Sequence, residues 1–435
     1  MFVEDGMGAI VLAVVYGFFF LSTLLFSAPL IAAVGCKWSL AIAITCYTGF
    51  MAAHFYATWG LFVPAAVFVG LGAAPLWVAK AHYLNLAAHD YSKLKGITKD
   101  AAASLFFGFF FFFFQSSSIW GNIISSQVLV PVADNSSSES LSYTSNNKDS
   151  LAQCGRNFCP QYADFNNTNL LQPLKSQLYM LAGIYTSCAC IAFIVVLFLQ
   201  QLPSEVNRKS NCWNRLDPKE LFSTLRHLKD CRQLLLIPIT IYHGMEQGFF
   251  ISDYLQAYIT CPLGKQWVGY VAICYGVVDA ISAAFFGKLA QFTGRVPIMV
   301  LGLLSHLSLA VALLFVNTSN LQTYVYFVIA GFWAWVMLFG LPTSAVSAES
   351  SYQYYYMEES LRIHSFYGVL FKENSKAGFA NFRMWQAVGP ILSFGYQSQL
   401  CLPIKVYILI GTLIVGFAGY VTVEVLEKRK SITTS

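Results

Sequence analysis

The composition of this 435-residue chain is that of a membrane protein. Hydrophobic residues make up 57% of it and charged residues only 11%, whereas an average soluble domain is about 25% charged. The net charge of +5 comes from basic residues dispersed among loops. They form no stripe interleaved with stacking aromatic residues, so nucleic acid is not an expected partner. The partner that this composition predicts is the lipid bilayer.

Eleven segments are apolar enough, and long enough at about 20 residues each, to cross a bilayer as helices. Five precede a polar break and six follow it. We therefore predict an all-α, polytopic helix bundle with an N-terminal half (1–200), a cytoplasmic linker (201–232), a C-terminal half (233–427) and a cytoplasmic tail (428–435). The predicted spans are 8–34, 39–57, 61–79, 101–130, 176–199, 234–259, 267–286, 296–316, 324–341, 379–400 and 406–426.

Lys and Arg residues concentrate in alternate loops, in the linker and in the C-terminal tail. By the positive-inside rule these segments are cytoplasmic. Because the number of spans is odd, the N-terminus is expected outside. Its acidic start, with Glu4 and Asp5, fits that side and lacks the basic region of a signal peptide.

The loop 131–175 is then outside, and it is rich in Ser and Asn. It contains glycosylation acceptors at Asn135 and Asn166, which are used only on that side. Four cysteines are also expected outside, where the oxidising environment permits disulfides. The simplest pairing joins Cys154 to Cys159, and the other two are Cys261 and Cys401.

Four polar residues follow one another on the first span of the C-terminal half, namely His243, Glu246, Gln247 and Asp253. Their spacing places them on one side of a regular helix. Ionisable groups inside a membrane are costly and are therefore functional candidates. One interpretation is a cavity wall that binds a cation or solute or moves protons. The alternative is an internal hydrogen-bond network between helices.

For other intramembrane polar residues, the sequence gives less support for a functional role. Gln115 and Asn122 share a helix face with Ser118, and we favour a packing role for them. Asp279 and Arg383 are opposite charges on different spans of one half, and an interhelical pair would reduce their insertion cost.

Glycines in the third span favour close helix packing, as the string around Gly70 and Gly72 shows. Phosphate-binding loops, dinucleotide fingerprints, nucleophile elbows and His-Glu-x-x-His metal motifs are absent from the sequence. We therefore expect no metal, no cofactor and no enzymatic activity.

Two loops contain the same sequence motif, small-x-Leu-x4-Gly followed by a basic residue. The first ends in Gly35 and Lys37, and the second runs from Gly287 to Gly294 and Arg295. The pattern resembles the motif between the second and third helices of each half in the major facilitator superfamily. Such repeats are typical of transporter folds built from two similar halves.

Longer strings resemble the Unc-ninety-three family, over nearly the whole chain and most closely in its A-type branch. They are Gly70-Leu71-Gly72-Ala73-Ala74-Pro75-Leu76-Trp77, Gln115-Ser116-Ser117-Ser118-Ile119-Trp120-Gly121-Asn122, Phe379-Ala380-Asn381-Phe382-Arg383-Met384-Trp385, Gln247-Gly248-Phe249 and Tyr367-Gly368-Val369-Leu370-Phe371. Against that family, we expect the first helix of a twelve-helix fold to be missing. Residues 334–365 also depart from the family's polar tenth helix.

The resemblance implies a major-facilitator fold and a role as an accessory or trafficking partner of another membrane protein. Some members regulate two-pore-domain potassium channels, and others escort Toll-like receptors. The family implies the plasma membrane, with endosomal membranes as the alternative. The rival function is a secondary transporter of a small solute or cation, which would use the polar stripe and rock one half against the other.

Overall fold

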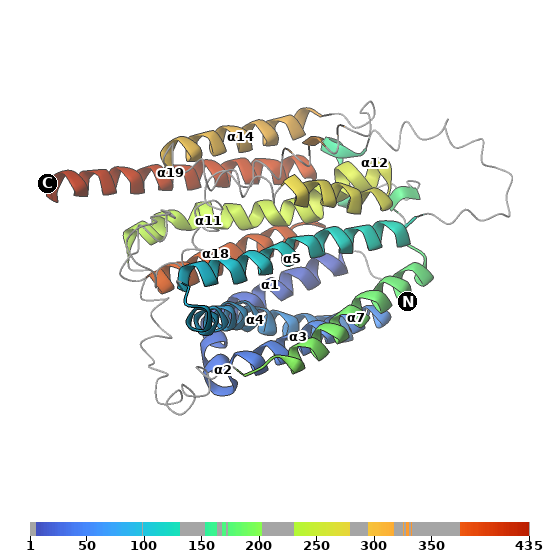
Figure 1. Ribbon diagram of the computed structural model, residues 1–435. Coiled ribbons are helices and arrows are strands. Elements are labelled where there is room, and N and C mark those ends of the chain that lie inside the picture. Colours follow the sequence, from blue (N-terminus) through green and yellow to red (C-terminus); the bar gives the residue numbers. More distant parts are fainter. Residues whose placement is uncertain are drawn as a thin grey trace.

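The computed structural model describes residues 6–97, 99–130, 153–162, 168–170, 173–201, 230–278, 295–316 and 375–434, together with residues 325, 328, 329 and 332. These residues form long helices that lie side by side in a bundle (Figure 1). The predicted all-α architecture is confirmed. Figure 1 also shows the two ends of the chain at opposite ends of the bundle.

Most of the predicted spans correspond to described helices. Among the described residues, six helices are long and apolar enough to cross a membrane, and two shorter apolar helices cover 266–278 and 299–315. Most of the predicted span 324–341 and the end of span 267–286 lie outside the described residues, as do residues 202–229 of the predicted linker 201–232. The main helices are α1 (Met7–Leu25), α2 (Ser27–Val34), α3 (Cys36–Ala53), α4 (Trp59–Lys95), α5 (Lys99–Val128), α7 (Lys175–Phe198), α11 (Cys231–Phe249), α14 (Arg295–Phe315), α18 (Ser375–Gly395) and α19 (Leu402–Thr434).

Helix α4 is much longer than the span predicted to end at residue 79. It continues to Lys95 and ends at Gly96, whose φ of 66° is the left-handed conformation that favours glycine at a helix end. The Lys80 ammonium lies 4.5 Å from the centre of the Trp77 ring and 4.1 Å from that of Phe110. These cation–π contacts help to accommodate a charge at the end of the apolar stretch.

The first of the two echoing motifs is largely helical and forms α2. It ends at Gly35, whose φ of 84° allows the chain to turn directly into α3. Ser39 donates a 2.7 Å hydrogen bond to the Gly35 carbonyl oxygen. Gly287 and Gly294 of the second motif lie outside the described residues, and Arg295 is the first residue of α14.

Glycines allow close helix contacts in the N-terminal part of the bundle, as predicted. A Cβ on Gly70 would come within 2.5 Å of the Val15 carbonyl oxygen of α1. A Cβ on Gly72 would lie 3.2 Å from Cys46 on α3. Helix α4 is therefore held tightly between α1 and α3.

Helix α11 occupies the equivalent central place among the later helices, between α18 and α19. Its first turn is capped by Asp230, whose carboxylate accepts a 2.9 Å hydrogen bond from the Arg232 backbone. A Cβ on Gly244 would overlap the Gln386 carbonyl oxygen of α18, and Gly416 of α19 lies against Ile239. These contacts leave no room for larger side chains.

Contacts also join the earlier helices to the later ones. The Tyr16 ring of α1 stacks on Phe394 of α18, with ring centres 5.9 Å apart. The Gln127 side chain of α5 donates a 2.7 Å hydrogen bond to the Tyr270 hydroxyl. The bundle is thus continuous across the polar break in the sequence.

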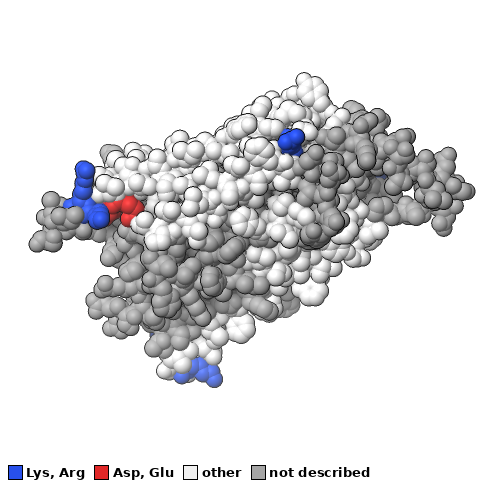
Figure 2. Space-filling model, turned by 90° about the horizontal axis from the view of Figure 1, so that it is seen from above, with Lys and Arg blue, Asp and Glu red and all other residues white. Residues whose placement is uncertain are grey.

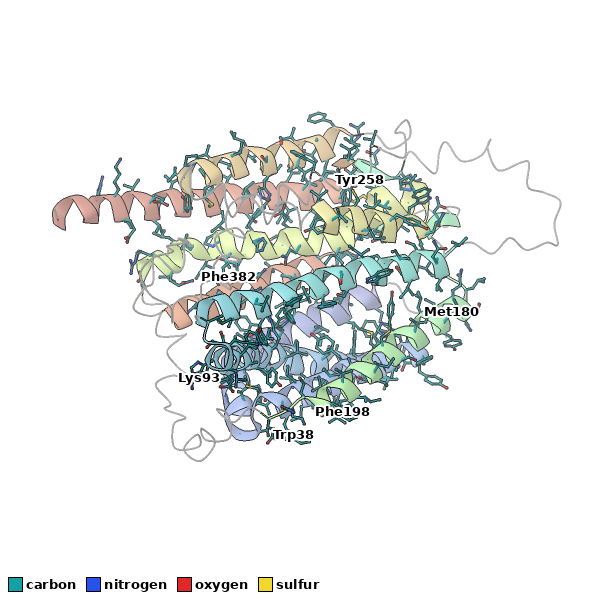
Figure 3. The ribbon with its side chains drawn as sticks, in the orientation of Figure 1. Trp38, Lys93, Met180, Phe198, Tyr258 and Phe382 are labelled. Carbon is teal, nitrogen blue, oxygen red and sulfur yellow. A yellow bond between two sulfur atoms is a disulfide. The ribbon has the colours of Figure 1, made fainter. Side chains whose placement is uncertain are left out.

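The outer surface suits a lipid environment. In Figure 2, the described surface along the middle of the visible face is almost free of charged side chains. Figure 3 shows Met180 and Phe198 on the outer side of α7, where they are 53% and 82% exposed. Large exposed apolar side chains of this kind face lipid in a membrane protein. The chain is therefore a multi-pass integral membrane protein.

Candidate functional site

The predicted polar stripe lies on α11 and its continuation. His243, Glu246 and Asp253 are all at most 8% exposed. After Phe249 the α-helix becomes a π-helix, η6 (Phe250–Thr260), before the short α12 (Cys261–Leu263). Because a π-helix has more residues per turn, it changes the direction in which Asp253 points relative to a regular helix. The side chains of the stripe contact three different helices, namely α14 for Glu246, α18 for His243 and Gln247, and α19 for Asp253.

Glu246 is directed toward α14. Its Oε1 atom lies 2.9 Å from Nδ1 of His306, and the Tyr242 hydroxyl lies 2.9 Å from the same nitrogen. All three side chains are buried. Within the part of the chain that the structure describes, no group forms a hydrogen bond with the second carboxylate oxygen of Glu246, Oε2.

A small cavity adjoins this cluster between α11, α14 and α19. Its volume is about 20 Å³. Tyr242, Glu246 and His306 supply its polar lining. The remaining lining is aliphatic and consists of Leu309, Ala310, Leu313, Val406, Leu409, Ile410 and Leu413.

His243 and Gln247 are directed toward α18. The Gln247 amide lies 3.5 Å from Nε2 of His243 and accepts a 3.5 Å hydrogen bond from Gln386. Gln386 in turn accepts a 3.1 Å hydrogen bond from Arg383. Asp279, the predicted partner of Arg383, lies outside the described residues.

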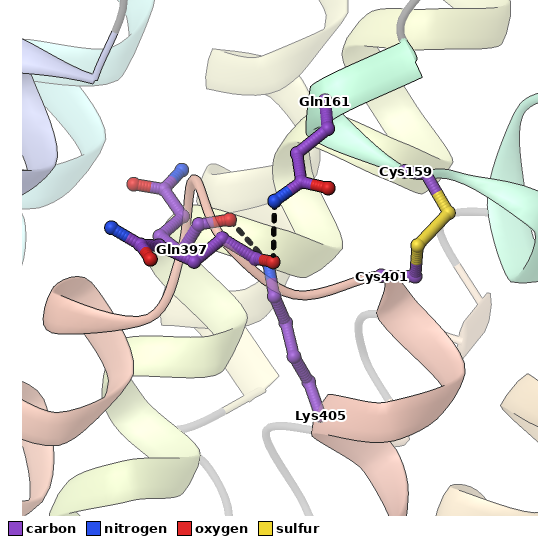
Figure 4. The surroundings of a disulfide bond; sticks show 6 residues. Cys159, Gln161, Gln397, Cys401 and Lys405 are labelled. Atoms are coloured by element: carbon purple, nitrogen blue, oxygen red, sulfur yellow. Dashed lines mark hydrogen bonds between the residues drawn. A yellow bond between two sulfur atoms is a disulfide. The ribbon is translucent and has the colours of Figure 1, made fainter.

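Asp253 forms an ion pair with Lys405 of α19, which is only 1% exposed. The Lys405 ammonium lies 2.5 Å from Oδ1 of Asp253 and donates a 2.6 Å hydrogen bond to the Gln397 carbonyl oxygen. Ser252 donates to the other carboxylate oxygen at 2.9 Å. Figure 4 shows Lys405 beneath the turn that joins α18 to α19, next to a disulfide.

Residues 153–162, which we call the capping segment, cover η6 and the start of α19. Phe158 is 4% exposed, and its carbonyl oxygen accepts a 3.0 Å hydrogen bond from the Leu402 backbone. Gln161 donates a 2.9 Å hydrogen bond to the Gln399 carbonyl oxygen (Figure 4). The segment belongs to the long loop between α5 and α7, yet it lies on helices from the other part of the chain.

Two disulfides fix the capping segment in place. Cys154 is bonded to Cys261 of α12, and Cys159 is bonded to Cys401. The predicted Cys154–Cys159 bridge is therefore wrong, although all four of the cysteines expected outside are disulfide-bonded. The capping segment is folded against α12 and the start of α19, and this packing brings Cys261 and Cys401 to its two cysteines.

The other predicted residues have less to do with this site. The Asn122 side chain of α5 donates a 2.8 Å hydrogen bond to the Ser118 carbonyl oxygen of its own helix. The backbone of Gln115 is also on α5. The glycosylation acceptors Asn135 and Asn166 lie outside the described residues.

Sequence reasoning missed both basic partners of the buried carboxylates. His306 stands within the predicted span 296–316, and an ionisable residue in an apolar span is a sufficient signal to single it out. Lys405 lies one residue before the predicted span 406–426, in the short segment 401–405 that the predicted topology places outside. The structure places it inside α19, three residues after the helix begins.

Comparisons with known proteins agree on a family. A family model described as "Ion channel regulatory protein UNC-93" matches residues 3–325. Protein unc-93 homolog A of Xenopus laevis is 34% identical over 440 residues, which cover 99% of this chain and 89% of that protein. The Caenorhabditis elegans "Putative potassium channel regulatory protein unc-93" is 25% identical over 431 residues, which cover 97% of this chain and 57% of that protein.

Among solved structures, the xylose transporter XylE of E. coli, in a partially occluded inward-open conformation, matches with a TM-score of 0.57 and 11% identity. The match covers 94% of this chain and 85% of that one. At this identity the likeness shows the fold alone, which is that of the major facilitator transporters. The chain belongs to the UNC-93 family, with a major-facilitator-like fold.

Proposed function

We propose that this protein regulates or helps to traffic another membrane protein, with a potassium channel as the first candidate. The family description refers to ion channel regulation, and the name of the worm relative refers to potassium channels. These names support a membrane-protein partner for this chain. The helix bundle and the capping segment would supply the contact surfaces.

The proposal rests on the two disulfide bonds that join the capping segment to the later part of the chain at one end of the bundle. A transporter of this fold works by rocking its halves apart at each end in turn. Here a segment between α5 and α7 is bonded to Cys261 and Cys401 of the later helices. Its return toward α7 is also held, because Asn169 donates a 3.1 Å hydrogen bond to the Cys261 carbonyl oxygen. Opening this end would have to break these contacts, so the arrangement favours a static contact surface over a rocking carrier.

The buried polar groups support the same proposal. Asp253 and Lys405 neutralise each other, and Glu246 is held by His306. The cavity beside Glu246 measures about 20 Å³, whereas pockets for small molecules are typically about 300–1,000 Å³. A sugar-sized solute would not fit there.

Secondary transport of a small solute or cation is the second candidate. It is favoured by the likeness to a xylose transporter and by ionisable side chains inside the bundle. It requires the end closed by the capping segment to open during each cycle.

The orientation that we infer places the N-terminus and the loop 131–175 outside and the C-terminus in the cytoplasm, with the plasma membrane ahead of endosomal membranes. We also infer that residues 201–232 link two halves of the bundle. Supporting features are the disulfides in the capping segment, which form in oxidising compartments, and the distribution of Lys and Arg. Glycosidase should increase gel mobility, and replacing Asn135 and Asn166 with Gln should abolish that shift. Unchanged mobility of the parent protein on glycosidase treatment would remove support for this orientation.

The test of function is co-expression with a potassium leak channel in cells that lack both proteins. We expect the current, or the amount of channel at the surface, to change relative to cells that express an unrelated polytopic protein at the same level. Uptake of a labelled solute panel is measured in parallel. Solute uptake without any effect on a panel of channels would refute regulation and establish transport.

A further inference from the structure

We propose that the cavity between α11, α14 and α19 is a binding site for one water molecule, and that Glu246 and His306 beside it share one exchangeable proton. This inference is independent of the proposed channel regulation. It rests on the hydrogen-bonding capacity of three buried side chains. Nothing in the family description assigns a role to them.

Nδ1 of His306 has two close polar neighbours but the capacity for one ordinary hydrogen bond. This atom lies 2.9 Å from both Glu246 Oε1 and the Tyr242 hydroxyl. A ring nitrogen offers either one hydrogen or one lone pair, so it cannot accept a hydrogen bond from both groups. When Nδ1 carries a hydrogen, it donates to the Glu246 carboxylate, and the Tyr242 hydroxyl hydrogen needs another acceptor. When Nδ1 lacks a hydrogen and accepts from Glu246, the proton resides on the carboxyl group.

With a second hydrogen on Nε2 of His306 throughout, the proton at Nδ1 is the one that moves, and Glu246 and His306 are neutral together in both arrangements. That is the charge expected for a pair buried in a membrane, since an isolated ion there is costly. Glu246 is 2% exposed and His306 is 7% exposed. The proton can move between an oxygen and a nitrogen that are already 2.9 Å apart.

Glu246 and Tyr242 retain unmet hydrogen-bonding capacity beside the cavity. Glu246 Oε2 is buried, none of the described residues donates a hydrogen bond to it, and it therefore needs a donor. When Nδ1 of His306 donates to Glu246, the Tyr242 hydroxyl hydrogen needs an acceptor. Both side chains line the cavity. One water molecule meets both needs, because it can donate to Glu246 and accept from Tyr242 at the same time.

The size of the cavity fits one water molecule. A water needs a cavity of about 10–15 Å³ or more and at least two polar partners, and this cavity measures about 20 Å³. A hydrated cation would need a ring of oxygen ligands, whereas the remaining lining residues are all aliphatic. The polar chemistry of the site is therefore that of water and a proton.

The charged groups nearest this site have partners of their own, because Asp253 pairs with Lys405 while Glu246 pairs with His306. On α11 the neighbouring titratable group is His243, whose ring stacks on Phe382 of α18 at 6.3 Å, on the side where Arg383 and Gln386 lie. The lining residues of α19 carry no charge, and Lys405 just before them is paired with Asp253. On α14 the cavity lining is otherwise aliphatic.

The test uses the purified full-length protein in lipid nanodiscs. Infrared difference spectra are recorded through a pH titration in ordinary and heavy water, since a protonated carboxyl group has a band that shifts on deuteration. We expect a deuteration-sensitive carboxyl band that disappears in Glu246→Gln and persists in Glu424→Gln, a matched change on α19. A spectrum in which Glu246→Gln removes no band would overturn the shared proton.

The water is tested by Tyr242→Phe, which removes one of its two partners and keeps the ring. We expect the Glu246 band to shift, because the hydrogen bonding of the carboxyl group changes, whereas Tyr420→Phe should leave it in place. A high-resolution structure should show one density peak within hydrogen-bond distance of Glu246 Oε2. An empty cavity in that structure would overturn the water site, and an unshifted band in Tyr242→Phe would remove Tyr242 from it.

Discussion

The buried ion pair between Asp253 and Lys405 makes a quantitative prediction about stability. The two side chains are 3% and 1% exposed, so neither charge is solvated by bulk water. Removing one partner of such a pair typically costs about 3–5 kcal/mol, because the other charge stays buried and unpaired. Replacing both with apolar residues of similar volume is often neutral or stabilising. Lys405→Met should therefore be far more damaging than Lys405→Met combined with Asp253→Leu.

The magnitude follows from the contacts of the ammonium group. Lys405→Met also removes the hydrogen bond to the Gln397 carbonyl oxygen, which adds about 0.5–1.5 kcal/mol. Asp253 keeps only the Ser252 hydroxyl. We expect a loss of at least 3 kcal/mol, which is about a hundredfold in the unfolding equilibrium constant.

The assay is equilibrium unfolding of the purified protein in mixed micelles, with Lys93→Met as the control, because Lys93 is exposed on α4. The double variant should recover most of the loss. Strictly additive effects of the two single substitutions would show that the two side chains do not interact. A single variant as stable as the control would contradict the ion pair itself.

Three further predictions concern close packing, a turn lysine and the disulfides. Gly244→Ala should destabilise the protein in a thermal assay because α18 occupies the space that a Cβ requires, whereas Gly276→Ala, which meets open space, should be neutral. Burial lowers the pKa of Lys265, in the turn after α12, to about 8, so its amine should be labelled at a lower pH than that of an ordinary lysine. Because the unfolded chain keeps that proton to higher pH, stability should rise with pH above about 8 in the parent and less so in Lys265→Met. Non-reducing peptide mapping should recover Cys154 linked to Cys261, and a Cys154–Cys159 peptide would contradict the fold of the capping segment.

The architecture was predictable from sequence because lipid imposes a simple rule. A chain in a bilayer must satisfy its backbone internally, so apolar runs of sufficient length become helices. The ends of the helices were less predictable. Helix α4 continues through Lys80 to Gly96, since its charged residues are compatible with a helix once it leaves the apolar layer.

The carboxylates of the site were predictable, but their partners were not. Glu246 and Asp253 stand out because charge is rare in apolar spans. Their partners, His306 and Lys405, are distant in sequence, and no local pattern specifies which residues meet. The change to a π-helix at Phe250 adds a second difficulty, because an offset of ten residues no longer describes one helix face. The positions of the charges could be predicted, whereas the contacts between helices required the three-dimensional structure.

The disulfides and the Asp253 ion pair belong to one connected unit, and this connection separates the two candidate functions. The Cys159–Cys401 bond holds the turn whose Gln397 carbonyl oxygen accepts from Lys405. A rocking carrier would be hindered by such a bond, so Cys401→Ser should increase solute uptake if this protein is a transporter. A regulator needs the same end as a fixed surface, so Cys401→Ser should weaken its effect on a channel while Cys190→Ser, at an exposed free thiol of α7, does not. A transporter thus predicts that Cys401→Ser increases solute uptake, whereas a regulator predicts that it weakens the effect on a channel. Measuring both in the same cells decides between the two functions.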